Sequence, residues 1–102
     1  MILYYRNPFG LCTVIHADFQ NETVWIENHT DVILHRAFGI NQNPSWKDFE
    51  EFLEERCFPR TRACMKLVLR DLGVDFYDPL AIIMKTQGRM AEDSQWLEIV
   101  EE

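Results

Sequence analysis

The residues of this sequence that could do chemistry include three cysteines and three histidines, all dispersed along the chain: Cys12, Cys57, Cys64, His16, His29 and His35. A cysteine nucleophile needs a histidine beside it, and a zinc site needs closely spaced thiols and imidazoles. A metal site here would have to combine Cys57, Cys64 and one of the histidines, at a spacing typical of no zinc motif. No Cys-x-x-Cys pair is present, and Cys57 and Cys64 fall on the apolar sides of predicted helices. We predict buried thiols in the reducing cytoplasm, and neither a metal nor a cofactor.

Other catalytic signatures are also missing. The glycines, Gly10, Gly39, Gly73 and Gly88, are far apart, so the sequence has no phosphate-binding loop, and no serine lies in a Gly-x-Ser-x-Gly turn. Glu92 and Asp93 are adjacent carboxylates, but neighbouring surface carboxylates are usually only solvated. The sequence therefore predicts a protein that is not an enzyme.

Composition points to one globular domain over residues 1–102. Hydrophobic residues make up 47% of the 102 residues, and no apolar run approaches the roughly 20 residues of a membrane span. The N-terminus has no basic stretch before its apolar residues, so we expect no signal peptide. The net charge of −7 argues against direct nucleic-acid binding, which needs a basic surface.

The charges form two blocks. Residues 48–55 contain only acidic charges and residues 56–70 only basic ones. Two interpretations stay open: either two solvated helix faces attract each other, or the basic block contacts an acidic or phosphorylated partner.

Short strands are expected in the first forty residues. Three β-rich runs, at 2–5, 11–19 and 23–27, are separated by the turn signals of residues 7–10 and 20–22. Residues 32–38 fit either a strand or a short helix. The fold class is therefore α+β, with a small antiparallel sheet packed against about three helices.

The helices are expected in the second half of the chain. Ser45 and Asp48 form a capping box, and the helix that follows ends before Pro59. A second helix runs from about Arg60 to Leu72, and a third begins at Asp78-Pro79. The tail, residues 92–100, is an extended segment or a strand. Cys64, Leu80 and Met84 are expected to face inward, together with the core residues Phe49, Phe52, Leu53, Leu67, Val68, Leu72 and Ile83. Met65 and Leu69 are expected to widen the core stripe of the second helix.

One combination of motifs goes beyond a generic α+β pattern. An aromatic helix ends in Arg56-x-x-Pro59-x-x-Arg62, and a Lys85-x-x-Gly88 turn precedes Asp93-x-x-Trp96-Leu97. With residues 37–40, these motifs cover about two thirds of the chain. The combination resembles the small segment found ahead of HipA-like serine/threonine kinase domains in Gram-positive bacteria.

The resemblance implies a separately encoded companion of such a kinase, because the chain stops where the kinase domain begins in that family. In split members of the family, a small protein corresponding to the N-terminal part neutralises the kinase. We therefore expect a non-catalytic, antitoxin-like regulator that binds a HipA-like kinase. The alternative is a phage-type acidic inhibitor that mimics nucleic acid and blocks a bacterial defence nuclease. The expected partner-binding residues are Arg56, Arg60, Arg62, Asp93, Trp96 and Leu97. A second interpretation stays open for the arginines: Arg56 and Arg62 tie the turn to Glu54, Glu55 or Asp93 within the domain.

Overall fold

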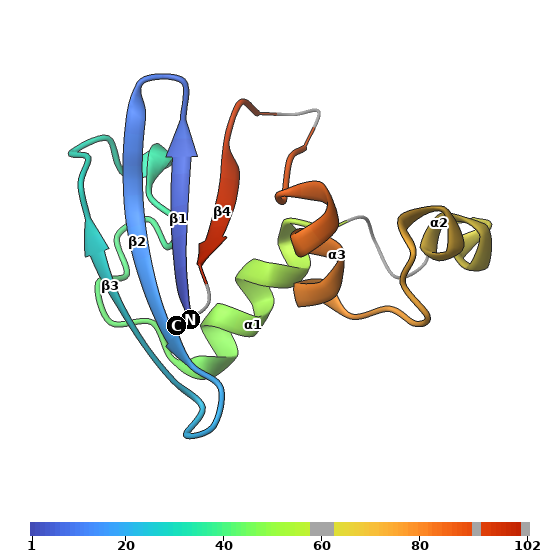
Figure 1. The fold of residues 1–102 in the computed structure, drawn as a ribbon. Coiled ribbons are helices and arrows are strands. Elements are labelled where there is room, and N and C mark those ends of the chain that lie inside the picture. The colour runs from blue at the N-terminus through green and yellow to red at the C-terminus, as the bar shows by residue number, and fades with distance from the viewer. Residues whose placement is uncertain (58–62, 91–92, 101–102) are drawn as a thin grey trace.

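A four-stranded antiparallel sheet and three α-helices make up the computed structural model, which describes residues 1–57, 63–90 and 93–100 (Figure 1). The predicted α+β fold is confirmed. The strands lie in the order β3-β2-β1-β4. Their bounds are β1 (Ile2–Asn7), β2 (Gly10–Asp18), β3 (Thr23–Asn28) and β4 (Trp96–Val100).

The sheet joins the two ends of the described chain. β1, β2 and β3 form a meander, as predicted, and the tail adds a fourth strand on the other side of β1, where Ile2 lies opposite Val100. A bulge at Cys12 shifts the register between β1 and β2, because Tyr5 lies opposite Thr13 and Arg6 opposite Leu11.

Helix α1 (Trp46–Glu55) begins where the sequence predicts. The Ser45 hydroxyl accepts a hydrogen bond from the Asp48 amide at 3.1 Å, and the Asp48 carboxylate accepts one from the Ser45 amide at 2.9 Å. This capping box satisfies two amides that the first helical turn leaves without partners. The predicted inward residues Phe49, Phe52 and Leu53 are all buried against the sheet.

Helix α2 (Met65–Leu72) corrects the sequence prediction. It begins after Cys64, which has a left-handed φ of 59° and an exposed side chain; residues 58–62 lie outside the described residues. Leu67 is 50% exposed, Val68 and Leu72 are partly buried, and Leu69 is the buried residue of the helix. Between Cys64 and Leu69 only Lys66 is polar, so the pattern did not single out one face. Gly73 ends α2 in the left-handed conformation, as expected.

Helix α3 (Pro79–Thr86) has the predicted start. The Asp78 carboxylate accepts from the Leu80 amide at 3.2 Å, and Pro79 occupies the first helical position. Ile82 and Ile83 are completely buried, whereas Met84, expected to face inward, is 46% exposed. The run from Leu80 to Met84 has no polar residue to mark the solvent side.

The remaining described segment, between β3 and α1, contains the short 3-10 helix η1 (Ile33–His35). This resolves the ambiguity of residues 32–38, where Ala37 and Phe38 pack against the core. Helix α1 lies against the sheet with α3 beside it, and α2 projects farther out (Figure 1). Within the described residues, no helix has both the length and the apolar character needed to cross a bilayer.

Replacing Phe52 by alanine should lower the free energy of unfolding by roughly 3–5 kcal/mol, because a buried ring leaves a cavity. Leu67→Ala is the matched control on a half-exposed helical position and should cost about 1 kcal/mol or less. Chemical denaturation of both variants checks this, and equal losses would contradict the described helix faces.

Candidate functional site

Arg56 is a buried charge at the end of α1, with a relative exposure of 6%. Its guanidinium forms a bidentate pair with Asp93, with Nη1–Oδ2 at 2.8 Å and Nη2–Oδ1 at 3.1 Å. A planar guanidinium matches a carboxylate in this way, which a lysine could not do. The pair joins the C-terminal end of α1 to the segment that enters β4.

The remaining donors of Arg56 reach three other parts of the fold. Its Nε donates to the Gly88 carbonyl at 2.9 Å, Nη2 to the Gln95 carbonyl at 2.8 Å, and Nη1 to the Tyr5 hydroxyl at 3.3 Å. The Tyr5 hydroxyl donates to Gln95 Oε1 at 2.9 Å, and Gln95 Nε2 donates to the carbonyl of His35 at 2.8 Å. One buried network therefore links α1, β1, the turn after α3, the entry to β4 and η1.

The electrostatics of this network fit a structural role. Hydrogen bonds from Arg56 lower the pKa of Asp93, which keeps the carboxylate ionised beside its cation. Burial raises the pKa of Tyr5 to about 12, so its hydroxyl stays protonated and can donate. The charges and polar groups of the network satisfy one another, which leaves none of them aimed at a ligand.

The predicted partner-binding residues do not form one surface among the described residues. Arg56 and Leu97 are buried, and Asp93 is engaged by Arg56, so the internal tie explains these three positions. Arg60 and Arg62 lie outside the described residues.

Trp96 lies elsewhere, on the face of the sheet opposite α1. We call this side the open face, because none of its residues belongs to the core cluster formed with the helices and no described element packs on it. The strand register places these residues on the open face: Ile2, Tyr4, Arg6, Leu11, Val14, His16, Asp18, Thr23, Trp25, Glu27, Trp96, Glu98 and Val100. Of these, Val14 is buried.

Two tryptophans lie at opposite corners of the open face, each with a side chain stacked on or lying over its ring. At one corner the Arg89 guanidinium lies 4.8 Å from the centre of the Trp96 ring. At the other corner the rings of His16 and Trp25 stack 3.6 Å apart, within 4° of parallel. Two side-chain contacts cross between strands, an ion pair of Arg6 with Glu98 at 3.1 Å and a hydrogen bond between His16 and Glu27 at 2.9 Å. Exposed aromatic side chains with arginine are typical of protein interfaces.

Trp25 is a surface residue that was not among the predicted partner-binding residues. The strand pattern contained the signal. In the run from Thr23 to Glu27, Val24 and Ile26 share one face of the strand, which puts Trp25 on the other face with Thr23 and Glu27. Arg89 was missed because its contact with Trp96 depends on how the turn after α3 meets β4.

Chemistry by thiols or metals finds no support in the described residues. Cys12 and Cys57 are buried, whereas Cys64, expected to be buried, is exposed. Burial raises the pKa of the Cys12 thiol, which disfavours the reactive thiolate. No group of three histidine, cysteine or acidic residues in the described part of the chain is arranged to hold a metal ion.

Truncating Arg56 to alanine should lower the free energy of unfolding by about 3 kcal/mol or more. The change removes the ion pair with Asp93 and leaves the buried carbonyls of Gly88 and Gln95 without the donor that Arg56 supplies. Arg6→Ala breaks a solvent-exposed arginine–carboxylate pair and should cost less than about 1 kcal/mol. Urea denaturation compares the two, and an equal small loss in both variants would contradict the central role of Arg56.

The ion pair should also make stability depend on pH. The lowered pKa of Asp93 stabilises the fold above the ordinary aspartate pKa, and this contribution disappears as the pH falls through the folded-state pKa. Asp93→Asn should therefore be less stable than the wild type at pH 7, by a difference that shrinks below about pH 4. Unfolding curves at pH 7 and pH 3 measure it, with Asp31→Asn, an exposed loop residue, as the control. A constant difference at both values would show that the carboxylate charge has no part.

We compared the chain with models of protein families, with curated proteins and with solved structures, and no match was found in any of the three.

Proposed function

We propose that this chain is a non-catalytic protein-binding module that acts as a companion, of the antitoxin type, to a HipA-like serine/threonine kinase. The observation that carries the proposal is the open face of the sheet, with Trp96 and Arg89 at one corner. Binding to the kinase restrains it or positions it.

The composition of the open face supports a protein partner. Val100 and Trp25 are 40% and 57% exposed, and Tyr4 and Trp96 are partly exposed beside them. Large exposed side chains on one face of a sheet, two of them tryptophans, are typical of a protein interface. Arg6 and His16 are each paired with a glutamate, so the face lacks the row of unpaired bases that a phosphate backbone needs.

The network around Arg56 supports the resemblance to the kinase-linked segment. Three positions of the resembling motifs, Arg56, Gly88 and Asp93, lie far apart in the sequence and meet in this one network. The motifs are therefore parts of one structural unit rather than unrelated fragments. In the kinase-fused relatives the counterpart of Trp96 comes just before the catalytic domain, which favours the Trp96 corner as the part nearest the kinase.

Trp96→Ala should weaken binding to a HipA-like kinase that co-purifies with this chain from its host by about 2 kcal/mol or more, roughly thirtyfold, because a tryptophan at an interface is a typical anchor. Titration of purified kinase with purified variant measures the affinity, and phosphorylation of a protein substrate shows whether binding restrains the kinase. Leu67→Ala, on α2 and distant from the sheet, is the control and should bind like the wild type (Figure 1). A folded Trp96→Ala variant with unchanged affinity would contradict the proposed surface, and absence of binding by the wild type would contradict the proposed function.

A second function is favoured by one feature of α1. Its solvent side carries four exposed carboxylates, Glu50, Glu51, Glu54 and Glu55. Such a row could imitate a phosphate backbone, as in a phage-type inhibitor of a defence nuclease. Inhibition that competes with DNA and is lost when these glutamates become glutamines would support this function, whereas unchanged cleavage by the nuclease would exclude it.

A further inference from the structure

We propose that the kinase also contacts the opposite corner of the open face, where Trp25 receives a lysine or arginine side chain from it. This inference rests on the proposed function and adds a second contact to it. It gives the partner surface a polarity: a cation toward Trp25 and a carboxylate toward Arg89.

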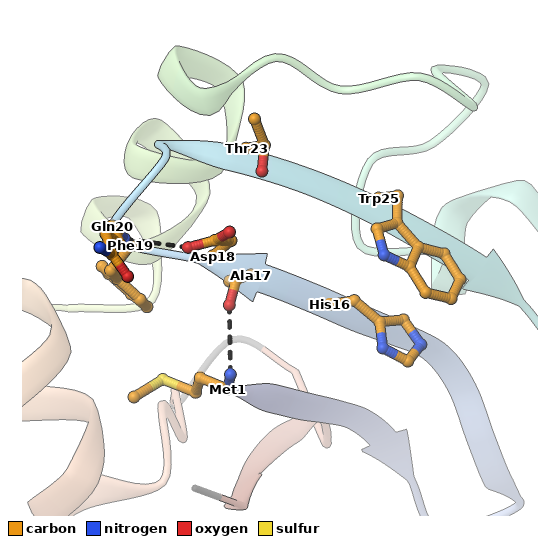
Figure 2. Close-up of a pocket in the computed structure, with 8 residues that line it drawn as sticks. All are labelled: Met1, His16, Ala17, Asp18, Phe19, Gln20, Thr23 and Trp25. Carbon is orange, nitrogen blue, oxygen red and sulfur yellow. Dashed lines mark hydrogen bonds between the residues drawn. The ribbon is translucent and has the colours of Figure 1, made fainter. Parts of the chain in front are cut away.

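The corner around Trp25 is hollowed. A surface cavity of about 770 Å³ lies where β2 ends and β3 begins, and the residues that line it include Met1, His16, Asp18 and Trp25. Figure 2 shows the rings of His16 and Trp25 side by side, with Asp18 and Phe19 farther along the hairpin and Met1 at the start of β1. The cavity is therefore open to solvent and bordered by an aromatic ring and a carboxylate.

Trp25 offers one side of its indole to a ligand. The other side is covered by the His16 ring, 3.6 Å away, and 57% of the residue remains exposed. The face of an indole attracts a cation, and tryptophan does so more strongly than tyrosine or phenylalanine. An ammonium or guanidinium group is thus the charged group that suits the free side of this ring.

Carboxylates reinforce that preference. The Asp18 carboxylate accepts hydrogen bonds from the side chain of Asn21 at 2.7 Å and from the amide of Gln20 at 3.0 Å, and the contacts with Asn21 lower its pKa. Glu27 is half exposed, and its carboxylate is hydrogen-bonded to the His16 ring. The ammonium of Met1 also lies here and donates to the carbonyl of Ala17. With histidine counted as neutral, the formal charges of Asp18, Glu27 and the Met1 ammonium sum to one negative charge at this corner.

The Trp96 corner has the opposite character. Arg89 lies over Trp96 and donates to the side-chain oxygen of Gln87, and no ion pair with a carboxylate is found for it in the described residues. A carboxylate on the partner could form a salt bridge with the Arg89 guanidinium. Complementary charges at two corners fix the orientation in which a partner docks.

The same charges disfavour the other occupants of the face. One cross-strand row runs Glu98, Tyr4, Val14, Glu27, with a glutamate at each end. If a second copy packed face to face with its strands aligned, glutamate would lie opposite glutamate in either two-fold arrangement. A nucleic acid would bring phosphates toward Asp18 and Glu27.

The two end glutamates of this row provide a matched test, with the same purified HipA-like kinase as the probe. Trp25→Ala should weaken the complex at least tenfold, and Glu27→Gln should weaken it severalfold by removing a charge that attracts the cation. Glu98→Gln frees Arg6 from its ion pair, makes the Trp96 corner more basic, and should leave the affinity unchanged or increase it. Raising the salt concentration should weaken the wild-type complex more than the Glu27→Gln complex.

The failures of the two proposals are distinguishable. If the wild type binds the kinase and Trp25→Ala and Glu27→Gln, both folded by circular dichroism, bind equally well, only the second contact is overturned. If Glu27→Gln and Glu98→Gln weaken binding alike, the proposed arrangement, with a partner cation at Trp25 and a partner carboxylate at Arg89, is overturned. Self-association of the wild type that Trp25→Ala abolishes, measured by sedimentation, would assign the corner to a second copy and overturn the inference. A wild type that does not bind the kinase overturns the proposed function as well.

Discussion

The fold depends on a buried arginine whose donors are all used inside the molecule. A guanidinium removed from water is costly unless its hydrogen bonds are replaced, and here a carboxylate, two carbonyls and a hydroxyl replace them. Because these acceptors come from the turn after α3, the entry to β4 and β1, the Arg56 side chain fixes how the C-terminal strand meets the rest of the sheet. A methyl group added at Gly88 would lie 3.4 Å from Arg56 Cβ and 3.3 Å from a Leu97 methyl carbon, so this approach leaves little room for a side chain.

The division of the sheet into a covered and an open face follows from the size of the chain. The covered face takes Leu3, Ile15, Leu97 and the rings of α1, and this layer supplies the core. The helices do not extend to the second face, so its rings and charges interact with one another instead. Cross-strand ion pairs and ring stacking tolerate water, which lets this surface exist without a partner and still offer aromatic area to one.

Local signals in the sequence were enough to predict much of the fold. The capping box at Ser45, the Asp78-Pro79 start and the left-handed Gly73 each depend on a few neighbouring residues, and the structure confirms them. The inward face of α2 was predicted wrongly because apolar residues surround that helix. The pair of Arg56 with Asp93 was one of the interpretations open from the sequence, but the rest of the arginine network could not be predicted from pattern alone, since its members come from five segments. Trp96 was singled out by motif resemblance, whereas the position of Trp25 on the open face required the register of β2 and β3.

The pairing of the first strand with the last has a kinetic consequence. Tyr5 and Gln95 are 90 positions apart, and Arg6 and Glu98 are 92 apart, yet both pairs are in contact. Closing so long a loop is entropically unfavourable and slows folding relative to local contacts. On the ribosome, the meander of β1 to β3 can form early. One edge of β1 then stays without a hydrogen-bonding neighbour until β4 is synthesised. During that interval the unpaired edge is exposed to other nascent chains, so completion of the sheet is the step at which misassembly competes with folding.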